Sequence, residues 1–386
     1  MKFYSIITPV ALVAAVGLSG CSKEVPPPSA GGVYRSESAG ALFEQSVQVT
    51  TTEGEYIAQF PLQNIHRPAH DPQSIYIAAG EQGIVISHDD GVSWKIFPTP
   101  LTFATDVIAL QSGVLVAAGR DAGGQGYVVR SLDEGKSWHA VFTVPTPVNE
   151  ESFKLVGGNG QSASSVVLTL EPDPFNADRI YGGTSLGSLF IGEQAAKVWR
   201  TFYTVQPEGP AIAIGSKQMG IRTLVVSPHT PGELLVITES KRLLRITNNT
   251  QTAIEVPAVI GIPKTPFLSG GERDVLDVSY IVGFPQALLV GVNDGAVVTR
   301  DGGQSWLQLS VPVEVAETFN SVVVRTSPTN ANRIFVAING VVYRSEDGGQ
   351  AWNTFSLGLP NYAIHDISIN PTNAAKALLV VHPLAT

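Results

Sequence analysis

The chain has 386 residues, of which 44% are hydrophobic and 15% are charged, and it contains 38 glycines and 26 prolines. This composition excludes a disordered chain and favours a turn-rich fold, and the formal net charge of -9 argues against nucleic acid as a partner. A single cysteine excludes a disulfide scaffold and any cysteine-rich metal site, and we expect neither a metal ion nor a cofactor.

The first 20 residues have the pattern of a bacterial secretion signal. Lys2 is followed by an apolar run from Ile6 to Leu18, which is too short to span a bilayer as a stable helix. The sequence Leu-Ser-Gly-Cys that ends at Cys21 resembles the lipobox of bacterial lipoproteins. This resemblance implies that Cys21 carries a diacylglyceryl group and becomes the mature N-terminus. An ordinary signal peptide with an incidental cysteine is the alternative.

Residues 21–32 are expected to form an extended tether, because three consecutive prolines occupy positions 26–28. In Gram-negative lipoproteins an aspartate after the lipidated cysteine commonly marks inner-membrane retention. Ser22 in that place favours anchoring at the periplasmic face of the outer membrane or at the cell surface.

An eight-residue pattern, S/T-x-D-x-G-x-S/A-W, occurs four times along the chain. A hairpin turn of this kind needs glycine for positive φ and a polar side chain that binds the turn amides. We therefore predict that the aspartates are structural turn residues rather than catalytic or metal-binding groups. The defining residues of the four copies are Ser87, Asp89, Gly91 and Trp94; Ser131, Asp133, Gly135 and Trp138; Thr299, Asp301, Gly303 and Trp306; and Ser345, Asp347, Gly349 and Trp352.

This pattern resembles the Asp-box, or BNR, repeat of sialidases, sortilin-type receptors, xyloglucanases and photosystem-assembly-factor-like propellers. The nearest overall resemblance is to the photosystem-assembly-factor-like group, which includes lipobox-bearing members with seven blades. It covers nearly the whole mature chain but depends on structural repeats alone. The arginine-rich binding patch of that group has no clear match here.

A second unit recurs before each copy: an apolar strand, a turn containing proline and another apolar strand. Residues 322–328 followed by 333–337 form the clearest example. Four short strands in each unit of about 40 to 55 residues are typical of a β-propeller blade. We predict six complete blades at 57–98, 105–143, 163–204, 220–257, 274–311 and 319–357.

A seventh blade is predicted to be shared between the two ends of the chain. Residues 364–370 and 377–381 provide two strands, after which the chain ends without a copy of the repeated turn. Residues 32–40 match residues 341–349, so Val33–Ser36 and Leu42–Val47 are predicted to be the third and fourth strands of the same blade. The prediction is an all-β protein with one domain, a seven-bladed propeller over residues 33–386, closed by pairing of N-terminal and C-terminal strands.

Long segments between the predicted blades are the candidate partner-binding surface. Two of them, within 207–220 and 259–273, are unusually apolar for loops, and they would form a hydrophobic patch if exposed. Folding of these loops over the blades is the alternative. The candidate contact residues are Ile212, Ile214, Ile260 and Phe267.

Enzymatic features are weak in the sequence. The G-x-S-x-G sequence at 183–187 falls between two predicted strands, where a nucleophile elbow would need a strand followed by a helix. The Arg-Ile-Pro motif of sialidases is missing. A glycosidase needs paired carboxylates, and the only pairable set lies in or beside the long connections: Glu150, Glu151, Glu272 and Asp274.

The sequence therefore predicts a membrane-anchored lipoprotein that acts as a non-enzymatic scaffold for another protein of the cell envelope. A carbohydrate-binding or glycoside-cleaving surface protein is the first alternative, so a glycan remains a candidate ligand. A purely structural spacer in an envelope assembly is the second alternative.

Overall fold

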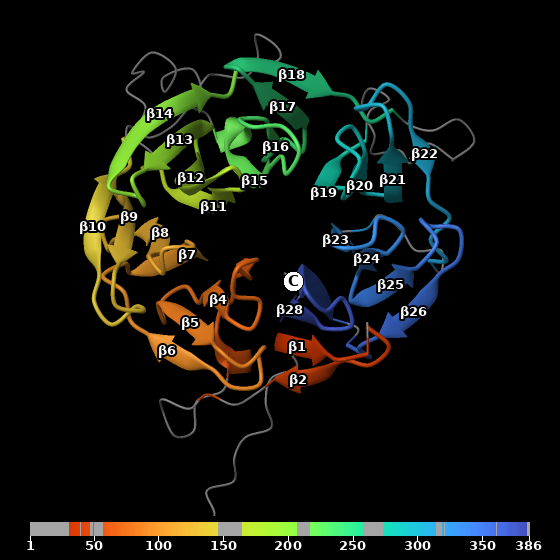
Figure 1. The fold of residues 1–386 in the computed structure, drawn as a ribbon, viewed down its shortest axis with the longest axis horizontal. Coiled ribbons are helices and arrows are strands. Elements are labelled where there is room, and N and C mark those ends of the chain that lie inside the picture. Colours follow the sequence, from red (N-terminus) through yellow and green to blue (C-terminus); the bar gives the residue numbers. More distant parts are fainter. Residues whose placement is uncertain are drawn as a thin grey trace, which may run out of the picture.

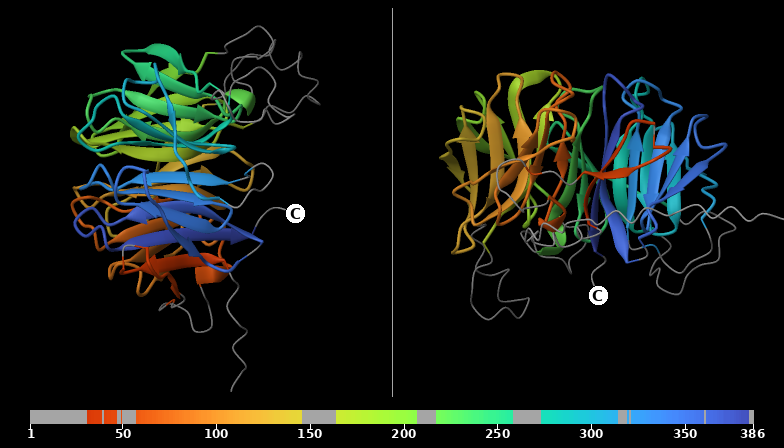
Figure 2. Two further views of the ribbon diagram at one scale, coloured as in Figure 1. Left: turned by 90° about the vertical axis from the view of Figure 1, so that its right-hand side faces the viewer. Right: turned by 90° about the horizontal axis from the view of Figure 1, so that it is seen from below.

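A computed structural model describes residues 31–38, 40–46, 49, 57–145, 164–206, 217–257, 273–313, 319, 321–359 and 361–383. Seven four-stranded antiparallel sheets stand around a central axis like the blades of a propeller (Figure 1). Figure 2 shows the ring from two sides, with the blades packed next to one another. The predicted seven-bladed all-β propeller is confirmed.

Each complete blade follows the chain from its innermost to its outermost strand. Blade 1 contains β3 (Ile65–His66), β4 (Ile75–Ala78), β5 (Ile84–Ser87) and β6 (Lys95–Phe97). Blade 2 contains β7 (Phe103–Ala109), β8 (Leu115–Arg120), β9 (Gly126–Ser131) and β10 (His139–Thr143). Blade 3 contains β11 (Val167–Asp173), β12 (Asn176–Thr184), β13 (Ser188–Glu193) and β14 (Val198–Thr204).

The second half of the ring repeats this order. Blade 4 contains β15 (Ile221–Val226), β16 (Leu234–Thr238), β17 (Leu243–Thr247) and β18 (Thr250–Ile254). Blade 5 contains β19 (Val275–Tyr280), β20 (Leu288–Val292), β21 (Gly295–Thr299) and β22 (Leu307–Gln308). Blade 6 contains β23 (Val322–Thr326), β24 (Ile334–Ile338), β25 (Val341–Ser345) and β26 (Asn353–Ser356).

Blade 7 is built from both ends of the chain, as predicted. Its strand order is β2 (Glu44–Ser46), β1 (Gly32–Ser36), β28 (Ala377–Pro383) and β27 (Tyr362–Ile369). Val33 pairs with Val380 across the junction of the two ends. This pairing closes the ring through backbone hydrogen bonds between residues more than 300 positions apart. The fourth strand is shorter than the predicted 42–47.

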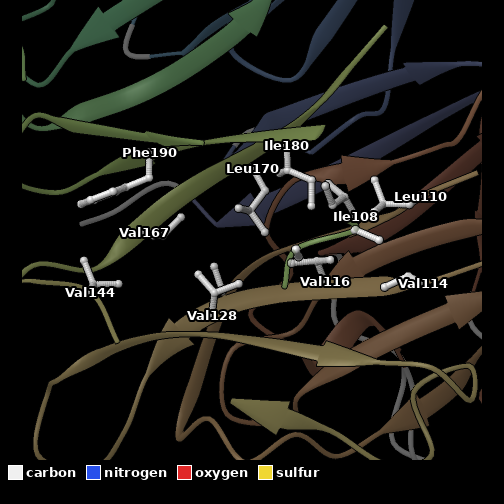
Figure 3. Packing of buried hydrophobic residues seen from close by; sticks show 13 residues of the cluster. Ile108, Leu110, Val114, Val116, Val128, Val144, Val167, Leu170, Ile180 and Phe190 are labelled. Atoms are coloured by element: carbon white, nitrogen blue, oxygen red, sulfur yellow. The ribbon is translucent and has the colours of Figure 1, made fainter. Parts of the chain in front are cut away.

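Two 3-10 helices, η1 (Ile57–Gln59) and η2 (Lys217–Met219), complete the regular elements of the described residues. None of the helices described here has the length and apolar character that crossing a membrane requires. The core lies between neighbouring blades, because the second strand of a blade is buried on both faces, as in β16, β20 and β24. Figure 3 shows such a contact, in which Ile108 and Val116 of blade 2 meet Leu170 and Phe190 of blade 3.

The four S/T-x-D-x-G turns join strands three and four of blades 1, 2, 5 and 6. In blade 1 the Asp89 Oδ1 atom accepts hydrogen bonds from the Ser87 hydroxyl at 2.7 Å and from the Ser93 amide at 2.8 Å. The Gly91 amide donates to Ser87 Oγ at 2.9 Å. Gly91 has φ of 80°, and a Cβ atom there would come within 2.9 Å of Leu378 in blade 7. Glycine is therefore required both for the turn and for contact between blades.

The turn of blade 3 reaches a similar shape with other residues. In blade 3 Gln194, Ala195 and Ala196 all have positive φ, and Trp199 Nε1 donates to the Ala196 carbonyl at 3.0 Å. Trp138 of blade 2 makes the same contact with the Gly135 carbonyl, also at 3.0 Å. The tryptophan contact therefore persists in blade 3 without the aspartate.

We call the side of the ring that carries these turns and the loops between strands one and two the turn face. The opposite side, which carries the loops between strands two and three and the connections between blades, is the connection face. β1 begins at Gly32, next to Val381 near the end of β28, so the chain enters the ring from the connection face.

Candidate functional site

The axis of the ring contains a cavity of about 1080 Å³. Its walls are the innermost strands of the seven blades: β3, β7, β11, β15, β19, β23 and β27. The lining continues into the loops between strands one and two, where Pro68, Phe175, Pro328 and Pro371 line it. The cavity therefore reaches the turn face. Phe175 in this rim is 48% exposed.

Three aspartates, Asp106, Asp277 and Asp366, occupy equivalent positions in the walls. Each follows a one-residue irregularity in the pairing of strand one with strand two, on β7, β19 and β27 respectively. Such a bulge bends a strand and redirects the next side chain. All three residues are at least 94% buried, and each is followed by valine or isoleucine.

Each aspartate connects its own blade to the next one. Asp106 accepts a hydrogen bond on Oδ1 from the Val107 amide at 2.8 Å and on Oδ2 from the Leu170 amide of blade 3 at 2.7 Å. Asp277 repeats this arrangement with the amides of its own next residue and of Val324 in blade 6, both at 2.9 Å. We call these contacts the inter-blade locks.

The third lock closes the ring. Asp366 accepts from the Ile367 amide at 2.7 Å and from the Ile65 amide of blade 1 at 2.9 Å. Both oxygens of each of the three aspartates are therefore engaged by backbone amides. A carboxylate used in this way stabilises the ring.

Arg325 on β23 joins two of the locks. One of its terminal nitrogens donates to Asp277 and to the Val324 carbonyl, and the other donates to Asp366. Burial lowers the pKa of Arg325, but the two carboxylates raise it by more, so its pKa lies above the ordinary value. The positive charge of Arg325 is compensated by the carboxylates of blades 5 and 7.

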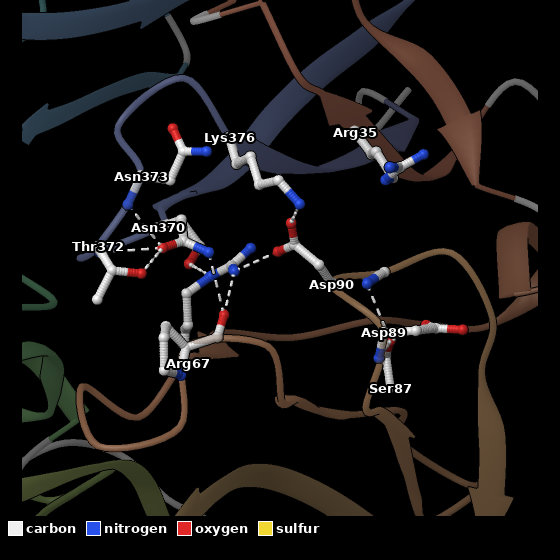
Figure 4. Close-up of polar contacts among 12 residues, drawn as sticks. Arg35, Arg67, Ser87, Asp89, Asp90, Asn370, Thr372, Asn373 and Lys376 are labelled. Carbon is white, nitrogen blue, oxygen red and sulfur yellow. Dashed lines mark hydrogen bonds and ion pairs between the residues drawn. The ribbon is translucent and has the colours of Figure 1, made fainter.

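Arg67 also lines the cavity, but its charge is compensated outside it. Its side chain is 2% exposed and forms an ion pair with Asp90, which in turn contacts the Lys376 ammonium at 2.8 Å (Figure 4). Arg67 also donates to the Pro72 carbonyl at 2.6 Å. This group joins the turns of blades 7 and 1.

Glu171 on β11 is the carboxyl group in the cavity that remains free. Within the described residues it has neither a hydrogen bond nor an ion pair. Burial raises its pKa to about 8, and the charge of Asp106 adds to this, while Arg325 acts in the opposite direction. Burial also raises the pKa of Asp106 to about 7, despite the hydrogen bonds that its oxygens accept.

Burial lowers the pKa of three histidines at or near the axis. Burial lowers the pKa of His66 to about 4, and its Nε2 atom lies 3.2 Å from the Ala109 carbonyl oxygen. His365 and His382 of blade 7 stack with ring centres 4.7 Å apart, and burial lowers the pKa of both. Among the described residues no group of three or more histidine, cysteine, aspartate or glutamate side chains could hold a metal ion.

The residues singled out from the sequence do not build this cavity. Of the pairable acidic set, Asp274 binds the Lys241 ammonium at 2.7 Å. The G-x-S-x-G segment forms the turn between β12 and β13, where Ser185 Oγ accepts from the Val166 amide at 3.1 Å. Several candidates lie outside the described residues: Cys21, Glu150, Glu151, Ile212, Ile214, Ile260, Phe267 and Glu272.

The locks, Arg325 and Glu171 were missed by the sequence analysis. A signal for the locks was present, because Asp-Val or Asp-Ile interrupts an apolar first strand at the same position of three blades. Arg325 and Glu171 each occur once, so no repetition marks them.

No protein-family model matches the chain, and no curated protein matches it. Among solved structures, YCF48 bound to D1 peptide superposes with a TM-score of 0.55 and 17% identity, covering 89% of this chain and 96% of that one. YCF48 from Cyanidioschyzon merolae superposes with a TM-score of 0.53 and 15% identity, covering 83% of this chain and 96% of that one. The GH74 enzyme of Niastella koreensis superposes with a TM-score of 0.51 and 12% identity, covering 87% of this chain and 66% of that one. These likenesses show the propeller fold.

Proposed function

We propose that this protein is a lipid-anchored, non-enzymatic scaffold of the bacterial envelope, and that its axial cavity receives part of a partner protein. The observation that carries the proposal is the cavity itself: it is large, it reaches the turn face, and three of its four aspartates are committed to the inter-blade locks. A propeller of this shape has been solved with a peptide bound, which fits the same kind of role.

The anchor and the cavity are expected on opposite sides of the ring. The chain enters β1 from the connection face, and a tether from Ser22 to Gly32 reaches at most about 35 Å when extended. A lipid on Cys21 would hold the connection face near the membrane. The cavity would then open away from the membrane, toward a partner in the periplasm or outside the cell.

Glycoside hydrolysis is the second candidate, because several carboxyl groups surround the cavity and a GH74 enzyme shares the fold. The pKa of Glu171, about 8, would suit a general acid. A glycosidase also needs a second free carboxylate. Asp106, Asp277 and Asp366 each have both oxygens bound to backbone amides. This supports binding over hydrolysis.

Replacing Cys21 by alanine is expected to move the protein from the membrane fraction to the soluble fraction and to abolish labelling by a radioactive fatty acid. The matched control is Ser22→Ala, which should keep both. A Cys21→Ala protein that stays labelled and membrane-bound would contradict lipid anchoring.

The docking site can be tested in cells with a photo-crosslinking amino acid placed at single positions. We expect adducts from Phe175 at the cavity rim, because its side chain is 48% exposed there. Leu307 on β22 is 64% exposed at the outer edge of blade 5, and it is expected to give none. Adducts only from Leu307, or only from Ile260 and Phe267, would contradict docking at the cavity. A rigid spacer would give none at any position.

A further inference from the structure

The cavity holds an imbalance of charge. Five carboxyl groups but only three guanidinium groups line it. Arg67 is paired with Asp90 from outside the cavity, and Asp173 is paired in the same way with Arg179, which leaves four carboxyl groups against Arg325 and Arg222. Arg325 binds Asp277 and Asp366. Arg222 on β15 is the third, and it forms no ion pair within the described residues. With Glu171 ionised, the walls therefore carry more negative than positive charge, which favours a positively charged occupant.

Glu171 is the carboxyl group of the cavity that has no partner among the described residues. The other charged and titratable groups that line the cavity are Asp106, Asp173, Asp277, Asp366, Arg67, Arg222, Arg325, His66, His70 and His365. None of them donates a hydrogen bond to its carboxylate. A half-buried carboxylate without a partner among the described residues is costly to ionise, so the group holds its proton up to about pH 8. A cation that enters the cavity would replace this proton and restore the ionised carboxylate.

The shape of the cavity indicates the size of the occupant. A volume of about 1080 Å³ is far larger than one inorganic ion needs, and it suits an extended peptide segment. The rim is apolar, with Phe175 beside Pro172 and Pro174 on the approach to Glu171. A long side chain can lay its methylene groups along such a surface while its charged end reaches further in.

We propose that the cavity binds a lysine or arginine side chain presented by an extended segment of the partner protein, with Glu171 as the counter-ion inside and Phe175 as the apolar contact at the rim. This inference rests on the proposed function, since it takes the occupant to be a protein. It adds the chemistry of the recognised residue and the group that recognises it.

The test measures binding of defined peptides to the full chain purified in detergent, by calorimetry. The first peptide has one central lysine among small neutral residues, and the second has norleucine in its place. We expect the lysine peptide to bind at least tenfold more tightly than the norleucine peptide. Glu171→Gln should remove this difference, while Glu134→Gln, which neutralises a 73% exposed carboxylate in the turn after β9, should preserve it.

The dependence on pH gives a second readout. Below pH 8 a proton competes with the lysine for Glu171, so affinity should rise at least tenfold from pH 6 to pH 9, where lysine is still charged. Glu171→Gln should show a clearly smaller rise than wild type, because only Asp106, whose pKa is about 7, still ionises in this interval. Equal affinity for both peptides in wild type, or an unchanged preference in Glu171→Gln, would overturn the inference.

Two further measurements complete the test. One distinguishes a protein side chain from a free amine as the source of the positive charge, and the other distinguishes this inference from the proposed function. Spermidine that binds as tightly as the lysine peptide would assign the cavity to free amines and overturn the protein source. The photo-crosslinking at Phe175 tests the proposed function separately. Unchanged adducts in Glu171→Gln would reject the counter-ion and keep the scaffold, whereas lost adducts in Glu171→Gln but not in Glu134→Gln would support both.

Discussion

Replacing Trp94 by alanine is expected to lower the free energy of unfolding by about 3–5 kcal/mol, the usual cost of removing a large buried aromatic side chain. Trp94 is fully buried between blade 1 and blade 7, where it packs with Val33, Leu378 and Val380. Its Nε1 atom donates to Ser46 Oγ on β2 at 2.9 Å. The substitution would therefore open a void at the junction where the ring closes. Urea denaturation followed by fluorescence and circular dichroism measures the effect.

Trp306 provides the matched control, because it closes the equivalent turn of blade 5. It is only partly buried, and its Nε1 atom donates to the Glu255 carbonyl at 3.1 Å. Trp306→Ala should cost at most about 2 kcal/mol. Equal losses in the free energy of unfolding would show that the junction of blades 7 and 1 depends on its tryptophan no more than the equivalent turn of blade 5 does.

The second large effect is expected for Asp366→Ala, with a loss of about 3 kcal/mol in the free energy of unfolding. Asp366 binds the Ile65 amide of blade 1 and the guanidinium of Arg325 in blade 6, so one side chain joins three blades. Its removal leaves a buried amide without a partner and halves the compensation of Arg325. Denaturation by urea measures the loss.

Asp178→Ala is the control, because Asp178 is an exposed residue whose side chain has no ion pair within the described part of the chain. A change within about 0.5 kcal/mol is expected there. A loss below about 1 kcal/mol for Asp366→Ala would mean that the locks contribute little to ring closure.

The fold was predictable because it repeats. Each S/T-x-D-x-G-x-S/A-W copy marks the end of strand three and the start of strand four, and the match of 32–40 to 341–349 located the closing blade. Such a turn is local, so its sequence carries its whole geometry: Ser87 and Asp89 bind amides at most four residues away. Strand ends were less predictable, as β2 shows.

The cavity was not predictable in the same way, because its contacts join distant residues. Asp106 binds an amide 64 residues later, and Asp366 binds one 301 residues away. Within a strand such an aspartate resembles any polar residue on a solvated face. Glu171 has no ion-pair partner among the described residues, and Arg325 of the same walls is bound to two other carboxylates. The sequence analysis instead predicts binding at apolar loops of the connection face, and Ile212, Ile214, Ile260 and Phe267 lie outside the described residues.

A crystal structure of the protein with the lysine peptide would test the cavity as a binding site most directly. The account predicts that the peptide enters from the turn face, that its chain contacts Phe175, and that the lysine ammonium lies within about 4 Å of the Glu171 carboxylate. A peptide bound elsewhere, with the cavity empty, would contradict it.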